Sequence, residues 1–167
     1  MSEAVKSADL SKASEAEGAA LETRKKTHQT IAAVTEDLKG FHFNKAVARI
    51  RELSNKVEEF KPSTDADTAT LKETLEALTQ LAAPMIPHLA EELWQMLGHD
   101  SLVAGAPWPT HDDSLLTEDQ VTIAIQVNGK LRGTLELPAD YDKARTEEAA
   151  MAHPAVLKSL EGKEPRK

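Results

Sequence analysis

The sequence predicts a mainly helical protein: a helical bundle followed by a small, incomplete α+β domain that contains a β-hairpin. Three observations predict this class. Helix-favouring Leu, Ala, Glu and Lys are frequent, whereas Gly is scarce, with 7 in 167 residues. Apolar residues recur with the period of a helix up to about residue 97, and with the two-residue period of a strand after residue 120. Aromatic residues make up 4% of the chain, so aliphatic side chains must fill the core.

Composition and charge exclude several classes of protein. There is no cysteine, and therefore no disulfide, thiolate zinc site or cysteine nucleophile. No run approaches the ~20 apolar residues of a membrane span, and the amino terminus does not resemble a signal peptide. We therefore expect a cytoplasmic protein that contacts no membrane. The formal net charge of -8 repels phosphates, so any binding of nucleic acid requires local clusters of basic residues.

Four helical segments joined by short breaks predict the bundle, which we assign to residues 21–112. We place the helices at about residues 21–39, 43–60, 67–83 and 87–97. Residues 1–20 are small and polar and are expected to be a mobile lead-in. Gly40 is a natural stop for the first helix, while Pro84 and Pro87 end the third helix and begin the fourth.

Each helix carries an apolar stripe that is expected to face the core. Arg24 and His28 lie near the apolar side of the first helix, so we expect an interhelical ion pair for Arg24 and a hydrogen-bonded packing role for His28. Trp94 and Trp108 are expected in the core rather than as platforms for stacked bases. The stripes comprise Leu21, Ile31, Thr35 and Leu38; Phe43, Ala46, Val47, Ile50, Leu53, Val57 and Phe60; Leu71, Leu75, Leu78, Leu81 and Ala82; and Leu89, Leu93 and Trp94.

The hairpin is predicted from Asn128-Gly129, which separates two alternating runs. A regular two-residue loop would pair Ile125 with Arg132 and mix charged with apolar side chains on one face. We therefore predict a bulged turn that turns Arg132 away from the apolar face. The residues expected on that face are Ile123, Ile125, Leu135 and Leu137. This partial C-terminal domain is assigned to residues 117–167, with Asp140 or Asp142 capping a helix to about Ala152 and a short helix from Pro154.

Several stretches resemble a known family. Leu81–Trp94 (LAAPMIPHLAEELW) is similar to the helix junction in the anticodon-binding bundle of class I aminoacyl-tRNA synthetases for Leu, Ile, Val and Met. Arg24–Ile31 (RKKTHQTI) and Phe43–Val47 (FNKAV) resemble bundle helices of leucyl-tRNA synthetases. Ala106–Pro109 (APWP) followed by Ile125–Arg132 (IQVNGKLR) resembles the passage into the small C-terminal domain of that family.

The resemblance covers about residues 21–167 and implies a C-terminal fragment of a leucine–tRNA ligase. Such a fragment would position tRNA(Leu) without catalysing a reaction, as partner to a catalytic domain of the same parent chain. ATP and Mg²⁺ would be used by that absent domain, and no cofactor is expected here. The resemblance also implies that the first bundle helix and a last strand are missing, which would leave surfaces prone to self-association. Two alternatives stay open: an acidic helical protein-interaction module, and the equivalent part of a valyl-, isoleucyl- or methionyl-tRNA synthetase.

Structured RNA is held mainly through its phosphates and 2′-hydroxyls, by Lys and Arg. The candidate tRNA-binding residues are Lys25, Lys26, Lys45, Arg49, Lys56, Lys130, Arg132, Lys163, Arg166 and Lys167. Lys45, Arg49 and Lys56 fall within ~40° of one another on the second helix, away from its apolar stripe. The alternative for these three is a solvated flank on which Glu52 pairs with a neighbour. The alternative for the cations of the small domain is protection of an edge strand by charge.

No catalytic residue or metal ligand is expected. Glu91 lies near His88, but no third ligand is in view, so capping or solvation of Glu91 is the better interpretation. There is no Gly-rich phosphate loop, and Asn128-Gly129 belongs to the hairpin.

Overall fold

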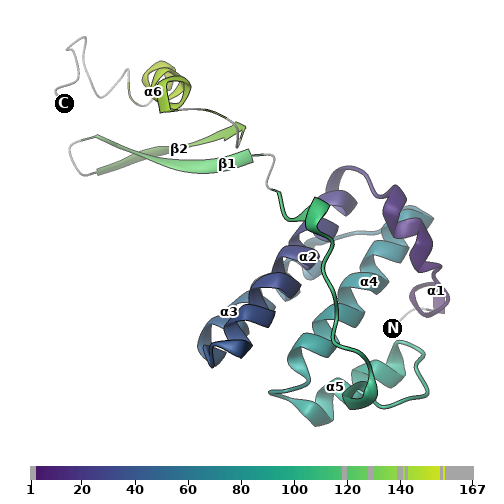
Figure 1. The fold of residues 1–167 in the computed structure, drawn as a ribbon. Coiled ribbons are helices and arrows are strands. Elements are labelled where there is room, and N and C mark those ends of the chain that lie inside the picture. The colour runs from purple at the N-terminus through teal and green to yellow at the C-terminus, as the bar shows by residue number, and fades with distance from the viewer. Residues whose placement is uncertain are drawn as a thin grey trace. The chain divides into compact units, whose positions relative to one another are not determined.

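The computed structural model of the chain describes residues 3–117, 120–127, 130–138, 141, 143–154 and 156, and only the backbone of residues 120–122, 127, 130–132, 136 and 138. The chain divides into two compact units, Met1–Leu116 and Thr117–Lys167 (Figure 1). The second unit begins at the residue where the sequence places the start of the small domain. Of the helices in the described ranges, none has the length and apolar character that a bilayer span needs.

The first unit is a helical bundle built around α4. Its elements are α1 (Glu3–Lys6), η1 (Leu10–Glu15), α2 (Gly18–Lys39), α3 (Phe43–Glu59), α4 (Asp65–Ala82), α5 (Pro87–Met96), η2 (Val103–Gly105) and η3 (Asp113–Leu115), where η marks a 3-10 helix. The central helix contacts α1, η1, α2, α3, α5 and η2 (Figure 1). The predicted class is confirmed, and the predicted helices lie close to the observed bounds.

Residues 3–20 differ from the expected mobile lead-in, because α1 and η1 both pack on α4. Ala13 and Ala16 are buried there, and their small side chains allow a close approach of the backbones. Lys72 of α4 donates from Nζ to the carbonyl of Lys6 at the end of α1, over 2.8 Å. This side chain satisfies a carbonyl that a short helix leaves without an internal partner.

The interface between α2 and α4 is lined by threonines. Thr23, Thr27, Thr70 and Thr74 are all fully buried. The hydroxyls of Thr27 and Thr74 lie 2.9 Å apart, and each also lies 2.8 Å from the carbonyl four residues earlier in its own helix. Each hydroxyl carries one proton, so only two of these three contacts are hydrogen bonds at any moment. The two hydroxyl protons can be distributed among the three contacts in different ways, and each hydroxyl oxygen still takes part in a hydrogen bond. The pair thus links the two helices.

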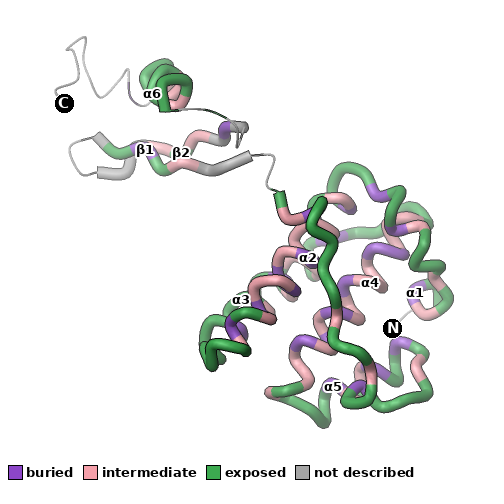
Figure 2. The backbone as a smooth tube through the Cα atoms, in the orientation of Figure 1, coloured by how far each residue is buried: buried purple, intermediate pink, exposed green. Residues whose placement is uncertain are grey.

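The apolar stripes predicted from periodicity are only partly buried (Figure 2). The core residues with no exposed surface include Val34, Ala46, Leu53 and Leu81. In contrast, Phe43 is 46% and Val47 53% exposed, because α3 turns Ala46 and Leu53 rather than these residues toward its neighbours α2 and α4. Leu89 of α5 is also exposed. The expectation that these three residues pack in the core is therefore wrong.

The start of α4 is fixed by a reciprocal pair of hydrogen bonds. The hydroxyl of Thr64 accepts from the backbone N–H of Asp67, and the Asp67 carboxylate accepts from the backbone N–H of Thr64, each over 3.1 Å. This is a capping box, which satisfies two helix-terminal donors at once. A further hydrogen bond from the Ser63 backbone N–H lowers the pKa of the Asp67 carboxyl below its ordinary value.

In the second unit, β1 (Gln120–Val127) and β2 (Lys130–Pro138) form an antiparallel hairpin. Ile123 pairs with Leu135, and Ile125 pairs with Gly133 rather than with Arg132. Ile125 and Leu137 are buried, whereas the intervening Ala124 and Thr134 are exposed. The predicted alignment of the odd-numbered apolar residues on one face is therefore confirmed.

The predicted position of the bulge is wrong. Val127 pairs with Lys130, which leaves a two-residue connection, and the register shifts between Ile125 and Gln126 instead. Gln126 pairs with Leu131 and Ile125 with Gly133, so Arg132 is the extra residue in β2. A bulge inside a strand changes the register by one residue just as a bulge at the turn does, and it allows the tight turn that Asn-Gly favours.

Helix α6 (Lys143–Ala152) of the second unit is followed directly by His153. A methyl group at Gly133 would come within 2.9 Å of His153 Cε1, so glycine permits the close approach of β2 to the end of α6. Asp140 and Asp142, the two predicted caps, lie outside the described residues. Pro154 and Val156 are helical, and the rest of the short helix predicted from Pro154 lies outside them.

Candidate nucleic-acid interface

Two ion pairs connect α2 to α3, and each uses a basic residue that the sequence assigns to tRNA. Lys26 Nζ lies 3.0 Å from Glu52 Oε2, and Arg49 Nε lies 2.7 Å from Asp37 Oδ2. The Asp37 side chain is only 9% exposed, so Arg49 neutralises a nearly buried carboxylate. The Lys26–Glu52 pair lies open to solvent on both sides, where such pairs contribute little to stability.

The predicted basic strip of α3 is therefore mixed in sign. Lys45 is exposed, Lys56 is half-buried, and Arg49 between them is 45% exposed while it holds Asp37. Glu52 falls on the same side of the helix, as the 100° period requires, and reaches across to α2. Lys25 of α2 is half-buried and also has a partner within the chain.

The other candidates belong to the second unit. Lys130 pairs with Val127 at the first position of β2, and Arg132 is the bulge residue. The side chains of both lie outside what the structure describes, and so do Lys163, Arg166 and Lys167 entirely.

Four basic residues lie near the α2–α3 turn, and the sequence between them contains no acidic residue. Between Asp37 and Glu52 the chain carries Lys39, Lys45, Arg49 and Arg51 but neither Asp nor Glu. Two of these four are paired with acids that flank the stretch, Lys39 with Glu36 at 2.8 Å and Arg49 with Asp37 at 2.7 Å, so the excess of positive charge near this turn rests on Lys45 and Arg51.

A second polar network, around Glu73 of α4, is structural. Arg24 Nε donates to Glu73 Oε2 over 2.9 Å, and His28 Nε2 lies 3.3 Å from Glu73 Oε1. The roles predicted for Arg24 and His28 are both confirmed. Burial alone would raise the pKa of Glu73, but the hydrogen bonds from His28 and Arg24, with the charge of Arg24, outweigh burial and lower that pKa below its ordinary value.

His28 also ties the segment after α5 to the bundle. The backbone N–H of Asp112 donates to His28 Nδ1 over 3.0 Å. Because Nδ1 accepts, the neutral ring carries its proton on Nε2 and donates it to Glu73. Glu73 lies off the apolar stripe of its own helix and was missed in the sequence. Its one sequence signal is the spacing of Arg24 and His28, which places two donors one turn apart on the same side of α2.

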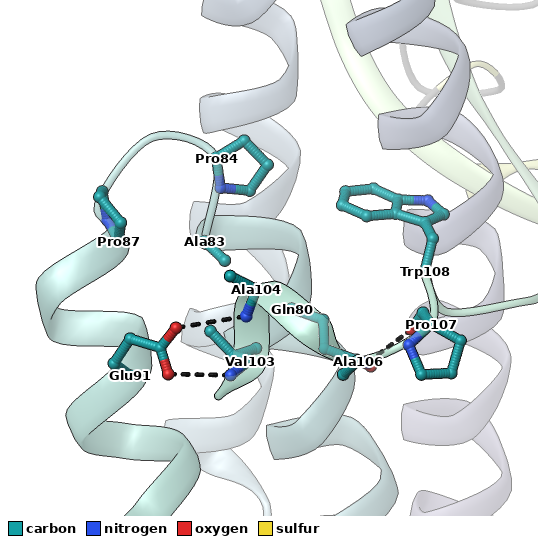
Figure 3. Close-up of a pocket in the computed structure, with 10 residues that line it drawn as sticks. All are labelled: Gln80, Ala83, Pro84, Pro87, Glu91, Val103, Ala104, Ala106, Pro107 and Trp108. Atoms are coloured by element: carbon teal, nitrogen blue, oxygen red, sulfur yellow. Dashed lines mark hydrogen bonds between the residues drawn. The ribbon is translucent and has the colours of Figure 1, made fainter. Parts of the chain in front are cut away.

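A hollow of about 300 Å³ lies between the α4–α5 turn and the segment from Val103 to Trp108 (Figure 3). The Glu91 carboxylate accepts from the backbone N–H groups of Val103 and Ala104, at 2.8 and 3.2 Å. Gln80 donates to the carbonyl of Pro107 over 2.9 Å. Capping, rather than metal binding, is thus the role of Glu91, and the polar groups of the hollow already serve to hold this segment in place.

The two tryptophans differ in burial. Trp94 is 5% exposed and stacks on His99, with ring centroids 3.6 Å apart, so its predicted place in the core is confirmed. Trp108 is 39% exposed and donates from Nε1 to the hydroxyl of Thr35 over 2.9 Å. The prediction that Trp108 lies in the core is wrong, because its indole N–H keeps the ring at the surface of α2.

The helical bundle, its junction at Pro84 and Pro87 and the hairpin unit that follows it define the class of the protein: a helical-bundle domain with a small appended α+β unit. Residues 22–148 match the family model described as the anticodon-binding domain of tRNA ligase. The chain belongs to this family. Among the described residues there is no cluster of three or more His, Asp or Glu side chains that would hold a metal ion.

Within the family, the chain is similar to leucine–tRNA ligases. It is 54% identical over 149 residues to the leucine–tRNA ligase of Paramagnetospirillum magneticum, a match that covers 89% of this chain and 17% of that protein. It is 51% identical over 140 residues to that of Rhodospirillum rubrum, covering 84% and 16%. The chain therefore spans less than a fifth of the length of these relatives. The resemblance inferred from the sequence motifs is confirmed.

A solved structure supports the same relation. The chain matches the LeuRS of Agrobacterium radiobacter K84, crystallised in a ternary complex with tRNA and LeuAMS, with a TM-score of 0.70 and 30% identity. The match covers 90% of this chain and 19% of that one. It extends beyond the bundle, so the hairpin unit belongs to the shared architecture as well.

Proposed function

We propose that this chain is the part of a leucine–tRNA ligase that holds the body of tRNA(Leu) while a separate catalytic domain aminoacylates its 3′ end. The observation that supports this proposal most strongly is the 54% identity to a leucine–tRNA ligase over 89% of the chain. The similarity to a LeuRS crystallised with tRNA supports RNA as the partner. The valine, isoleucine and methionine alternatives and the protein-interaction module have no comparable support.

Contact with tRNA is proposed to run along α3. Lys45 and Lys56 offer exposed or half-exposed ammonium groups on one side of the helix. Arg49 uses its Nε–H for Asp37, yet a guanidinium has five N–H donors and 45% of this side chain is exposed. Arg49 is thus able to hold Asp37 and a phosphate together.

The Lys26–Glu52 pair is proposed to open when RNA binds. Both side chains are exposed, at 38% and 62%, and an exposed pair of this kind is worth about 0–1 kcal/mol. A phosphate that approaches Lys26 replaces Glu52 at small cost. The candidates in the second unit, from Lys130 to Lys167, would extend the contact to a second region of the tRNA.

The function of such a holding domain is orientation. Fixing the tRNA body restricts where its acceptor end lies, which reduces the entropy that the reaction must otherwise lose. We propose that ATP and Mg²⁺ act in another part of the ligase, and we assign no chemical step to residues of this chain.

Charge reversal tests the proposal. Lys45→Glu combined with Lys56→Glu is expected to weaken binding of a tRNA(Leu) transcript at least about tenfold at low salt, because two phosphate contacts become repulsive. Arg49 is left unchanged so that Asp37 keeps its partner. The matched control carries the same change of charge at Lys61 and Lys143, two exposed lysines outside the proposed contact. Equal affinities for the two double variants would contradict the assignment of α3.

A further inference from the structure

The turn between α2 and α3 contains a residue in an unusual backbone conformation. Phe41 has a φ of 56°, and in the part of the chain that the structure describes it is the one residue other than glycine with a positive φ. A bulky side chain rarely adopts this left-handed conformation, because its Cβ approaches the following carbonyl.

The hydrogen bonds at this turn show why the left-handed residue is needed. Phe41 N–H donates to the carbonyl of Leu38 over 3.1 Å, and His42 N–H donates to the carbonyl of Asp37 over 2.7 Å. This is a Schellman motif, in which glycine normally takes the left-handed position. Here the adjacent Gly40 has a φ of -85° instead.

Gly40 serves a different purpose in the turn. A methyl group at this position would lie 3.0 Å from two ring atoms of His42, so glycine clears space for that imidazole. The left-handed conformation falls on Phe41, one residue later. Backbone strain of this kind persists in proteins where it holds a side chain in a particular place. Here the strained backbone of Phe41 determines where its ring lies.

The Phe41 ring is presented to solvent. It is 80% exposed, the largest fraction among the exposed large apolar residues in the described ranges. Its neighbour Phe43 is 46% exposed, and the two ring centroids lie 6.1 Å apart with an interplanar angle of 73°. An edge-to-face pair of this kind orients the rings and leaves a face of the pair uncovered.

The charge around these rings distinguishes between possible partners. The stretch from Asp37 to Glu52 that contains them has four basic residues and no acid between its ends. Of the four, Arg49 holds Asp37, and Lys39 forms a solvent-exposed pair with Glu36 that a phosphate replaces at small cost. The second exposed apolar group in the bundle, Ile86, Leu89 and Met96 along α5, is aliphatic, and the only charged residues of that helix are Glu91 and Glu92. An open aromatic ring beside several cations is the combination that binds single-stranded nucleotides.

We propose that Phe41 is a stacking platform for an unpaired RNA base, with the neighbouring lysines Lys39 and Lys45 facing the phosphates on either side of that base. The proposal rests on the proposed function, since it names which feature of the RNA this end of the domain contacts. It adds to the phosphate contacts of α3 a contact that depends on an unstacked base and therefore discriminates loops or bulges from duplex RNA.

The test uses the whole chain with two changes at one position. Phe41→Gly removes the ring and relieves the backbone strain, so it is expected to fold at least as stably as the unchanged protein. Phe41→Trp keeps a stacking surface and adds a fluorophore. The probes are a short oligoadenylate and a blunt RNA duplex with the same number of phosphates, besides a tRNA(Leu) transcript. Leu102→Ala, at another exposed apolar residue, is the control.

We expect Phe41→Gly to weaken binding of the oligoadenylate and of the tRNA by about 5- to 150-fold, the range expected for one stacked base, and to leave binding of the duplex unchanged. Adding the oligoadenylate to the Phe41→Trp variant should quench fluorescence beyond the change seen in the unchanged protein. Equal loss with duplex and oligoadenylate, or no loss with either, overturns the proposal. So does a Phe41→Gly variant whose main change is loss of self-association, because the ring would then be a protein contact.

The stacking contact of Phe41 and the phosphate contacts of α3 are tested by separate variants. If Lys45→Glu with Lys56→Glu weakens tRNA binding and Phe41→Gly does not, the platform is wrong and the proposed function stands. If the charge reversals have no effect while the fluorescence of the Phe41→Trp variant responds to the oligoadenylate, Phe41 stacks on a base, but Lys45 faces no phosphate and the assignment of α3 to tRNA phosphates is wrong.

Discussion

Arg49 on α3 lies with Nε 2.7 Å from Oδ2 of Asp37 on α2, so a residue assigned to RNA from its helical position also holds the helix pair together. Since Asp37 is nearly buried, removal of Arg49 strands a carboxylate away from water. Removal of the carboxylate strands only a half-exposed guanidinium. The two substitutions should therefore differ in cost.

We expect Arg49→Ala to lower the free energy of unfolding by about 1–3 kcal/mol, and Asp37→Asn to lower it by less. The loss of unfolding free energy in the double variant should be smaller than the sum of the two single losses, since both substitutions remove the same interaction. Denaturant titration measures all three values. Arg51→Ala, an exposed change on the same helix, should cost within about 0.5 kcal/mol; a similar loss there would show that the pair is not responsible.

The network around Glu73 predicts a dependence of stability on pH. The folded pKa of this carboxyl lies below its ordinary value of 4.5, so its contribution is fully present above that value and is lost as the pH falls through the folded pKa. Glu73→Gln should therefore destabilise the protein at pH 7 and make progressively less difference as the pH falls below 4.5. Denaturant midpoints over this range check the prediction. A constant difference between the two proteins at every pH would contradict it.

An unsatisfied hydroxyl predicts a stabilising substitution in the core. Thr70 Oγ1 is buried and has no hydrogen-bond partner among the described residues. Valine has nearly the same shape and no polar atom, so Thr70→Val should leave stability unchanged or raise it by about 1 kcal/mol. Thr27→Val is the matched comparison, because it removes a hydroxyl that contacts Thr74. A melting temperature lowered more by Thr70→Val than by Thr27→Val would show that Thr70 has a partner after all.

The aliphatic stripe of α5 predicts self-association. Ile86, Leu89 and Met96 are 48%, 51% and 41% exposed, and their spacing places them along one side of the helix. Exposed apolar surface of this kind favours contact between copies. The sedimentation coefficient is expected to rise with protein concentration, and Leu89→Lys should reduce that rise. A chain that sediments as a monomer at all concentrations would contradict this prediction.

Local rules predicted most of the helices and strands. Pro84 and Pro87 end and begin helices for reasons confined to their own backbone, and alternation alone aligned Ile123 with Leu135. Periodicity identifies which side of a helix is apolar, but it does not give the number of neighbours that the helix meets. This is why Phe43 and Val47 were wrongly placed in the core.

Features that depend on two distant segments were not predictable in the same way. The partner of Arg49 lies on another helix, and the partner of His28 lies 84 residues away along the chain at Asp112. The bulge at Arg132 was required by the apolar pattern, but that pattern is satisfied equally well at the turn or inside a strand. The left-handed conformation falls on Phe41 although Gly40 lies directly before it, and no residue type in the turn signals this.

The most direct measurement is a titration of the whole chain with tRNA(Leu) and with an unrelated tRNA over a series of salt concentrations. Binding that depends on phosphate contacts releases counterions, so the logarithm of affinity should fall linearly and steeply with the logarithm of salt concentration. We predict such a slope, a smaller slope for Lys45→Glu with Lys56→Glu, and tighter binding of tRNA(Leu) than of the unrelated tRNA. An affinity that is independent of salt, or no detectable binding of either tRNA at low salt, would contradict it.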